Sequence, residues 1–237
     1  MIVVNNPNNP TGATIPRTVL EAIVAFAKAR NIIVLADEVY RPLFHGLSET
    51  EVPPSVLSFG YDKTVSTGSM SKAYSLAGIR LGWVASRDRA IVEAIASARD
   101  YTTISVSQLD DQLASYALSE AVLPSLMERN IQLSRTNAKL LGDFIKRHAS
   151  HCTWLPPTAG TTAFVQFLQG GGEPVDDEKF CLDVLNKTKV LFLPGSRCFG
   201  HERDFKGFVR IGYVCETSVL EEALDKLGAY VEARLMP

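Results

Sequence analysis

A short, unbroken apolar run, IIVLA, occupies residues 32–36 and narrows the choice of fold class more than any other segment. A strand covered on both faces reads as a continuous apolar run rather than as an alternation of apolar and polar residues. An apolar stripe at helical spacing precedes this run, between Pro16 and Asn31, and two further candidate strands follow at residues 64–67 and 81–85. This order predicts an α/β domain with a mostly parallel sheet. The residues of the stripe are Val19, Leu20, Ile23, Phe26 and Ala27.

The second half of the chain has a different pattern. Apolar positions between residues 123 and 147 fit one long helix, with Pro124 in its first turn. Further along, two helices and two strands are indicated, the helices at residues 179–187 and 216–234 and the strands at 190–194 and 207–214. We therefore expect a three-layer α/β/α large domain in residues 1–120. Residues 121–237 are expected to form an interdomain helix and a smaller α+β domain.

Composition and charge exclude several classes of partner. The formal net charge of −2 gives no basic surface for nucleic acid or for an anionic membrane, and no apolar run approaches the length of a membrane span. The first ten residues lack the layout of a secretory signal peptide. The four cysteines are far apart and form no CxxC pair, which is typical of reduced thiols in a cytoplasmic protein.

The sequence contains one cluster of potential metal ligands. His148, His151 and Cys152 lie close together at the predicted end of the long helix. No second cluster completes a metal-ligand set, so a solvated helix terminus is the preferred interpretation and no metal site is predicted.

Four polar constellations follow or precede the predicted strands of the first domain. They are NNPNNPTG at residues 5–12, DEVY at 37–40, SMSK at 69–72, and Arg80. Taken singly, each has a structural explanation: a turn, an Asp37 cap on a helix beginning near Glu38, or solvated cations. Arg210, in a predicted strand, has the alternative of a structural ion pair. In α/β sheets, however, ligands bind outside the carboxyl ends of the strands, so their conjunction predicts a binding site.

The chemistry of these groups suits one cofactor. A lysine amine can condense with an aldehyde, and an aspartate can keep a pyridine nitrogen protonated so that the ring accepts electron density. An arginine beside serine hydroxyls makes charge-assisted hydrogen bonds to a phosphate. An aldehyde, a pyridine ring and a phosphate together describe pyridoxal 5′-phosphate (PLP).

Four segments in this order carry a family resemblance: NNPNNPTG, LADEVY, SMSKAYSLAGIRLGW and FVRIGY. They resemble the fold-type I PLP enzymes of the class I/II aminotransferase family, and the resemblance extends over essentially the whole chain. It implies a transferase that moves an amino group from an amino acid to a 2-oxo acid. Two alternatives stay open: a related PLP lyase or synthase on the same scaffold, and a non-catalytic paralogue that acts through a protein partner.

The resemblance assigns roles at the reactive face of the cofactor. Lys72 matches the lysine that holds PLP as an internal aldimine and later moves a proton between the substrate and the cofactor. Asp37 matches the partner of the pyridine nitrogen. Asn9 and Tyr40 match the residues that bind the phenolic oxygen of the cofactor, and the resemblance also assigns Asn9 to substrate binding.

It also assigns roles to groups that bind anions. Ser69 and Arg80 match phosphate ligands, and Ser71 is a candidate to assist them. Arg210 matches the arginine that binds the α-carboxylate of the substrate, a role that suits the planar guanidinium. The family's P-G-x-x-F-G loop corresponds to PGSRCFG at residues 194–200, one residue longer.

The chain departs from the family pattern at its N-terminal side. Family members carry a block of large domain ahead of the asparagine loop, and that block supplies a helix N-terminus for the phosphate, a ring-stacking aromatic side chain and a dimer-forming arm. We therefore expect an N-terminally incomplete large domain, weakened cofactor binding, and either a homodimer or a partner that supplies the missing block. TAGTTAF at residues 158–164 also differs from the family pattern, so the amino donor is not predicted.

Overall fold

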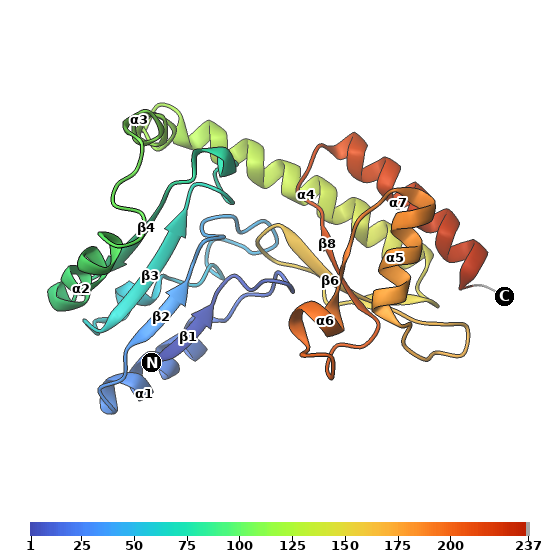
Figure 1. Ribbon diagram of the computed structural model, residues 1–237, viewed down its shortest axis with the longest axis horizontal. Coiled ribbons are helices and arrows are strands. Elements are labelled where there is room, and N and C mark those ends of the chain that lie inside the picture. Colours follow the sequence, from blue (N-terminus) through green and yellow to red (C-terminus); the bar gives the residue numbers. More distant parts are fainter. Residues whose placement is uncertain (236–237) are drawn as a thin grey trace. The chain divides into compact units, whose positions relative to one another are not determined.

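The computed structural model describes residues 1–235 of the chain (Figure 1). The chain divides into two compact units, each of which is assembled from discontinuous segments. The first unit comprises residues 1–8, 13–131 and 158–160. The second comprises residues 9–12 and 132–157 and the chain from Thr161 onward. The asparagine loop therefore contributes to both units.

The first unit contains a four-stranded sheet whose strands follow one another in sequence order (Figure 1). The first three strands are parallel and the fourth is antiparallel to its neighbour, so the predicted α/β class and mostly parallel sheet are confirmed. The last strand reverses because no long helix between residues 70 and 81 carries the chain back to the other end of the sheet. The strands are β1 (Ile2–Asn5), β2 (Val34–Asp37), β3 (Thr64–Ser69) and β4 (Gly82–Ser86).

Helix α1 (Arg17–Ala29) covers this sheet with a narrower apolar stripe than the sequence predicts. Leu20, Val24 and Ala27 are buried against β1 and β2, whereas Val19 and Phe26 are about half exposed. The prediction was wrong for Val19 and Phe26, and it missed Val24. The Phe26 ring instead lies under the guanidinium of Arg30, whose central carbon is 3.8 Å from the ring centroid.

A second apolar cluster in this unit holds the segment that contains Lys72. Met70 and Ala73 are fully buried there, against Ala114 and Ala117 of helix α3 (Gln108–Ala117). The Asn130 side chain fixes the same segment, because its amide nitrogen donates to the Ala73 carbonyl at 2.8 Å. The remaining elements of the unit are η1 (Val56–Phe59), η2 (Ala77–Ile79), α2 (Arg89–Arg99) and α3 (Gln108–Ala117).

Apolar side chains on β4 and α2 are open to solvent. Trp83 and Val84 of β4 and Val92 and Ile95 of α2 are each more than a third exposed. Isolated exposed apolar residues are ordinary, but neighbouring ones on a strand and on the helix that packs against it indicate a surface suited to contact with another polypeptide.

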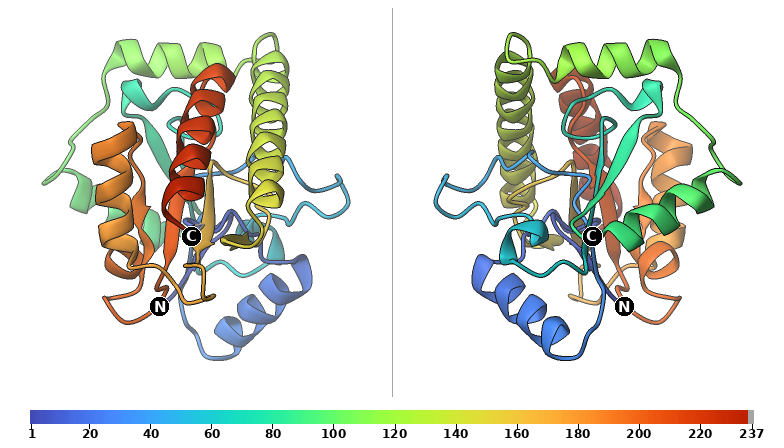
Figure 2. Two further views of the ribbon diagram at one scale, coloured as in Figure 1. Left: turned by 90° about the vertical axis from the view of Figure 1, so that its right-hand side faces the viewer. Right: turned by 90° about the vertical axis from the view of Figure 1, so that its left-hand side faces the viewer.

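The second unit is an antiparallel sheet with helices, as expected for a smaller α+β domain. Its strand order is β5-β6-β8-β7, and helix α4 (Leu123–Arg147) belongs to it from Gln132 onward. Figures 1 and 2 both show helix α7 (Thr217–Arg234) alongside the C-terminal part of α4. Leu141 and Phe144 of α4 share a core with Leu220, Leu224 and other buried residues. The elements are β5 (Cys152–Trp154), β6 (Thr162–Phe167), α5 (Asp177–Thr188), β7 (Leu193–Pro194), α6 (Gly195–Phe199), β8 (Phe208–Gly212) and α7 (Thr217–Arg234).

The long helix was predicted with both of its ends correct, whereas the strand at residues 190–194 was predicted too long. Only Leu193 and Pro194 pair with β8. Leu191 is two-thirds exposed, so the apolar character of VLFLP does not reflect a fully buried strand.

The cysteines of the second unit differ in their environment, and this difference predicts their reactivity. Burial raises the pKa of the Cys152 thiol to about 12, and burial together with the charge of Asp177 raises that of Cys181 to about 12. Cys198 is exposed. Since the thiolate is the reactive form, an alkylating reagent at neutral pH should label Cys198 rapidly and Cys152 and Cys181 only after denaturation.

Peptide mapping by mass spectrometry checks this expectation. Cys198→Ser should remove the fast phase of labelling and leave the slow phase unchanged. Rapid labelling of Cys152 in the folded protein would contradict the burial described above.

Within residues 1–235, no helix has an apolar stretch that could cross a membrane. In the same residues, no three His, Cys, Asp or Glu side chains form a group that could hold a metal ion. The solvated helix terminus predicted for His148, His151 and Cys152 was wrong, because all three side chains are buried.

Candidate active site

Asp37 lies at the carboxyl end of β2, and its carboxylate is held by the neighbouring strand. It is in register with Asn5 of β1 and Thr67 of β3. Oδ1 accepts hydrogen bonds from the Thr67 hydroxyl at 3.1 Å and from the Val39 backbone N–H at 3.3 Å. The residues after Asp37 form turns, with no helix near Glu38, so the helix-cap alternative was wrong. The orientation of this carboxylate comes from the strand pairing.

The adjacent carboxylate, Glu38, has a different set of partners. It is buried, and its two oxygens accept from the Val56 backbone N–H at 2.9 Å and from the Ser66 hydroxyl at 2.8 Å. Successive residues of a strand point to opposite faces, so Ser66 and Thr67 of β3 bind different carboxylates. Glu38 therefore has a structural role, in tying the segment that contains η1 to β3.

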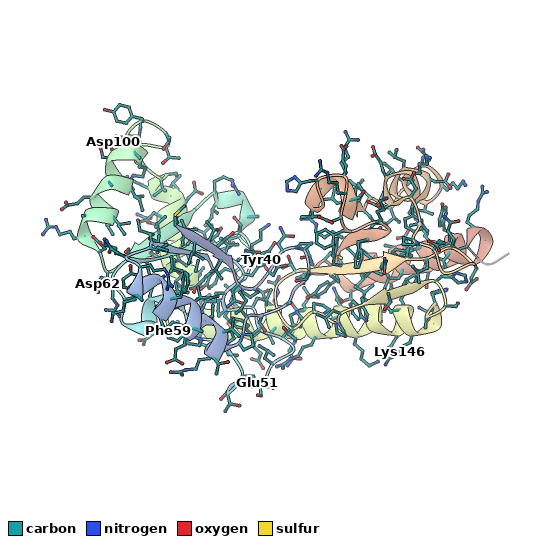
Figure 3. All side chains as sticks on the ribbon, turned by 90° about the horizontal axis from the view of Figure 1, so that it is seen from below. Tyr40, Glu51, Phe59, Asp62, Asp100 and Lys146 are labelled. Atoms are coloured by element: carbon teal, nitrogen blue, oxygen red, sulfur yellow. The ribbon has the colours of Figure 1, made fainter. Side chains whose placement is uncertain are left out.

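Lys72 follows β3 and lies near Tyr40, which follows β2. The Lys72 ammonium nitrogen is 5.9 Å from the centroid of the Tyr40 ring. Tyr40 is 5% exposed and is labelled in Figure 3, whereas the Lys72 side chain is open to solvent. An added Cβ at Gly160 would lie 3.4 Å from the Tyr40 ring, so the ring is closely covered on that side. The structure thus brings Lys72 and Tyr40 together at the edge where β2 and β3 end.

Ser69 ends β3, and Ser71 and Arg80 lie on the segment that connects β3 to β4 and contains Lys72. The Ser71 backbone N–H donates to the Ser69 hydroxyl oxygen at 3.1 Å, which leaves the Ser69 hydroxyl proton able to donate elsewhere. Arg80 has a left-handed backbone with φ of 53° and is exposed. Its guanidinium donates to the Ala77 carbonyl at 2.9 Å, which holds the side chain over its own turn.

Arg210 and Asn9 come together in the second unit. One Arg210 guanidinium nitrogen donates to the Asn9 side-chain oxygen at 3.2 Å, and the guanidinium carbon is 5.6 Å from the Phe199 ring centroid. No carboxylate within residues 1–235 forms an ion pair with Arg210, so the structural ion-pair alternative is not supported. A half-buried guanidinium that is held by an amide and an aromatic ring is suited to bind an anion.

The strand that carries Arg210 is fixed at its carboxyl end by Asn137 of α4. This buried side chain donates to the Tyr213 and Cys215 carbonyls, both at 2.8 Å, and accepts from the Thr217 hydroxyl at 2.9 Å. Sequence reasoning missed both Asn137 and Thr67. For Thr67, the alternation of side chains along β3 combined with the parallel pairing to β2 was a usable signal. For Asn137 there was no usable signal in the sequence, because polar residues are common in an amphipathic helix.

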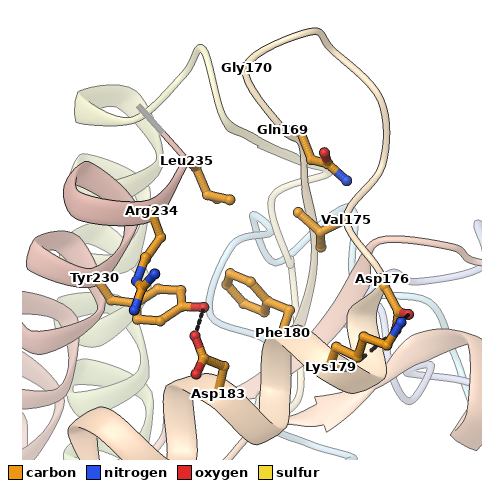
Figure 4. Close-up of a pocket in the computed structure, with 10 residues that line it drawn as sticks. All are labelled: Gln169, Gly170, Val175, Asp176, Lys179, Phe180, Asp183, Tyr230, Arg234 and Leu235. Carbon is orange, nitrogen blue, oxygen red and sulfur yellow. Dashed lines mark hydrogen bonds and ion pairs between the residues drawn. The ribbon is translucent and has the colours of Figure 1, made fainter. Parts of the chain in front are cut away.

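A cavity of about 630 Å³ lies in the second unit away from these residues (Figure 4). Phe180, Tyr230 and Val175 contribute apolar surface to it, and the Tyr230 hydroxyl donates to Asp183 at 2.7 Å. None of the predicted site residues lines this cavity. The size of this cavity alone is therefore no reason to assign the candidate site to it.

Comparison with known proteins gives a consistent family match. Residues 1–227 match the family model described as aminotransferase class I and II. An aspartate aminotransferase of Thermotoga maritima is 29% identical over 98% of this chain, and a capreomycidine synthase of Streptomyces vinaceus is 31% identical over 99%. A crystal structure of a PLP-dependent aminotransferase from Streptococcus suis is similar with a TM-score of 0.86 and 36% identity over 99% of this chain. The chain spans only 56–57% of the length of these three proteins.

Proposed function

Because the chain belongs to the class I and II aminotransferase family, we propose that it transfers an amino group from an amino acid to a 2-oxo acid with PLP as the cofactor. The observation that carries the proposal is the common edge at which β2 and β3 end, where Asp37 and the Lys72 segment lie. The named relatives above support the same reaction type.

The residues at this edge fit PLP. Both hydrogen bonds that the Asp37 carboxylate accepts involve Oδ1, and within residues 1–235 none reaches Oδ2. That oxygen can accept from a protonated ring nitrogen. The Ser69 hydroxyl and the exposed Arg80 guanidinium are donors of the kind that bind phosphate. When bound, PLP supplies a pyridinium ring that accepts electron density from the α-carbon of the substrate.

The protein's own groups then have distinct roles in the proposed reaction. Lys72 holds the aldehyde end of the cofactor and moves the proton at the substrate α-carbon. Tyr40 and Asn9 bind the phenolic oxygen, and Arg210 binds the α-carboxylate of the substrate. In this proposal residues 1–120 form the cofactor-binding domain, and residues 121–237 form the interdomain helix and the small domain.

The proposed partners follow from the same reasoning. We infer small amino acids and 2-oxo acids as substrates and a cytoplasmic location, with no nucleic-acid or membrane partner. The exposed apolar residues of β4 and α2 support a homodimer or another protein partner.

A related PLP synthase is a second candidate, favoured by the 31% identity to a capreomycidine synthase over 242 residues. A lyase of the same scaffold would also use Lys72 and Asp37. These alternatives share the cofactor and the lysine and differ in the fate of the amino group.

A single-turnover experiment distinguishes these candidates. The purified protein is saturated with PLP and mixed with candidate amino acids in the absence of a 2-oxo acid. An aminotransferase should convert the cofactor to pyridoxamine phosphate and release one 2-oxo acid. Ammonia without pyridoxamine phosphate indicates a lyase, and a cyclised amino acid indicates a synthase. A protein that takes up no PLP contradicts all three and leaves the non-catalytic alternative.

A further inference from the structure

We propose that Thr67 is a positioning residue for Asp37, whose Oδ1 it holds so that Oδ2 is left for the ring nitrogen of the cofactor, a role that rests on the cofactor assignment above. Thr67 belongs to none of the motifs on which the family resemblance was based. The role of Thr67 follows from the register of β2 and β3, which places it opposite Asp37.

The geometry is that of adjacent parallel strands. Thr67 on β3 pairs directly with Asp37 on β2, and its hydroxyl donates to Oδ1 at 3.1 Å. The Val39 N–H donates to the same oxygen at 3.3 Å. Two donors on one carboxylate oxygen restrict rotation of the carboxylate about its terminal torsion, which is broad when it is unconstrained. Asp37 is therefore oriented before any ligand binds.

The residue type at position 67 suits this task. A β-branched side chain has few χ1 rotamers, so the Thr67 hydroxyl is held in place more firmly than a serine hydroxyl would be. The neighbouring hydroxyl of Ser66 is already bound to Glu38, at 2.8 Å, and cannot replace it. Of the carboxylates at the end of β2, Asp37 is thus oriented by Thr67 and Glu38 by Ser66.

The test compares PLP with an analogue in which a C–H group replaces the ring nitrogen. Thr67→Val keeps the shape of the side chain and removes the donor, Thr67→Ser keeps the donor, and Ser66→Ala is the control for loss of a neighbouring hydroxyl. Dissociation constants of the full chain for both ligands are measured by fluorescence quenching. Thermal melting of each ligand-free variant reports on its folding.

We expect Thr67→Val to weaken PLP binding about 3- to 10-fold, the range for one hydrogen bond, and to leave binding of the analogue unchanged. Thr67→Ser should retain most of the affinity for PLP. Ser66→Ala should change both affinities by the same factor, because Glu38 does not face the ring nitrogen in this proposal. If Thr67→Val does not fold, Thr67→Ala takes its place in the same comparison.

Two outcomes overturn the role of Thr67 while the cofactor assignment stands. One is an equal loss for PLP and the analogue, which would indicate a merely structural role, and the other is no loss for either. If the unaltered protein binds no PLP, the cofactor assignment fails and the role of Thr67 fails with it.

Discussion

Replacement of Lys72 by alanine should prevent permanent attachment of PLP after borohydride treatment and should lower the rate of amino transfer by at least about 10²- to 10⁴-fold. That range is typical of the loss of a positioned acid/base, and loss of the covalent link to the cofactor adds to it. The neighbouring residues Met70 and Ala73 carry the burial in this segment, whereas the Lys72 side chain is exposed. The substitution should therefore change the melting temperature little.

Lys63→Ala is the matched control. Lys63 precedes β3 as Lys72 follows it, and its ammonium donates to the Asn31 side-chain oxygen at 2.8 Å on the surface. This variant should retain both PLP attachment and activity. Mass spectrometry of the borohydride-treated protein locates the attached cofactor. Attachment at another lysine, or full activity in Lys72→Ala, would refute the role assigned to Lys72.

Arg210→Ala should lower kcat/KM for amino acids by about 10²- to 10⁴-fold. A guanidinium can make two charge-assisted hydrogen bonds to a carboxylate, each worth about 1.5–3 kcal/mol, and a tenfold change corresponds to about 1.4 kcal/mol. The kcat/KM of Arg210→Lys should lie between that of the unaltered protein and that of Arg210→Ala, because an ammonium keeps the positive charge and lacks the planar fork of donors. In Arg210→Ala the Asn9 oxygen, which lies 3.2 Å from the Arg210 guanidinium, would lose that donor.

The control for Arg210 is Arg197→Ala. Arg197 lies on α6 of the same unit and pairs on the surface with Glu178 at 2.6 Å. Exposed ion pairs contribute little to stability, so this variant should behave as the unaltered protein does. PLP attachment to Lys72 should persist in Arg210→Ala, which separates loss of the substrate carboxylate site from loss of the cofactor. An unchanged kcat/KM in Arg210→Ala would remove this residue from the proposed site.

The fold was predicted best where a pattern repeats over many residues. Helix α4 has apolar positions at helical spacing over 25 residues, and its observed bounds match the predicted ones. Short segments were predicted less accurately, because few residues carry the pattern and the strand with which a segment pairs decides where it begins and ends. VLFLP shows this, since only its last two residues pair with β8. The stripe of α1 shows the same limit, because Phe26 is at the correct spacing and still faces solvent.

The candidate site divides in a similar way. Lys72, Asp37 and Arg210 were identified from the sequence because their side-chain chemistry is specific and each belongs to a motif of fixed spacing. The partners that orient them were not identified, because they are ordinary residues brought close by pairing between distant segments. Thr67 is 30 positions from Asp37, and Asn137 is 76 positions from Tyr213, whose carbonyl it binds at the end of the strand that carries Arg210.

The chemical groups of the proposed site, the class of fold and the position of the long helix could all be predicted from the amino-acid sequence. Each of these depends on residue type and on spacing along the chain. Only the tertiary structure decided that turns rather than a helix follow Asp37, that β4 runs antiparallel, and which oxygen of Asp37 is held by Thr67. These features depend on register and packing between segments far apart in the chain, which local patterns do not encode.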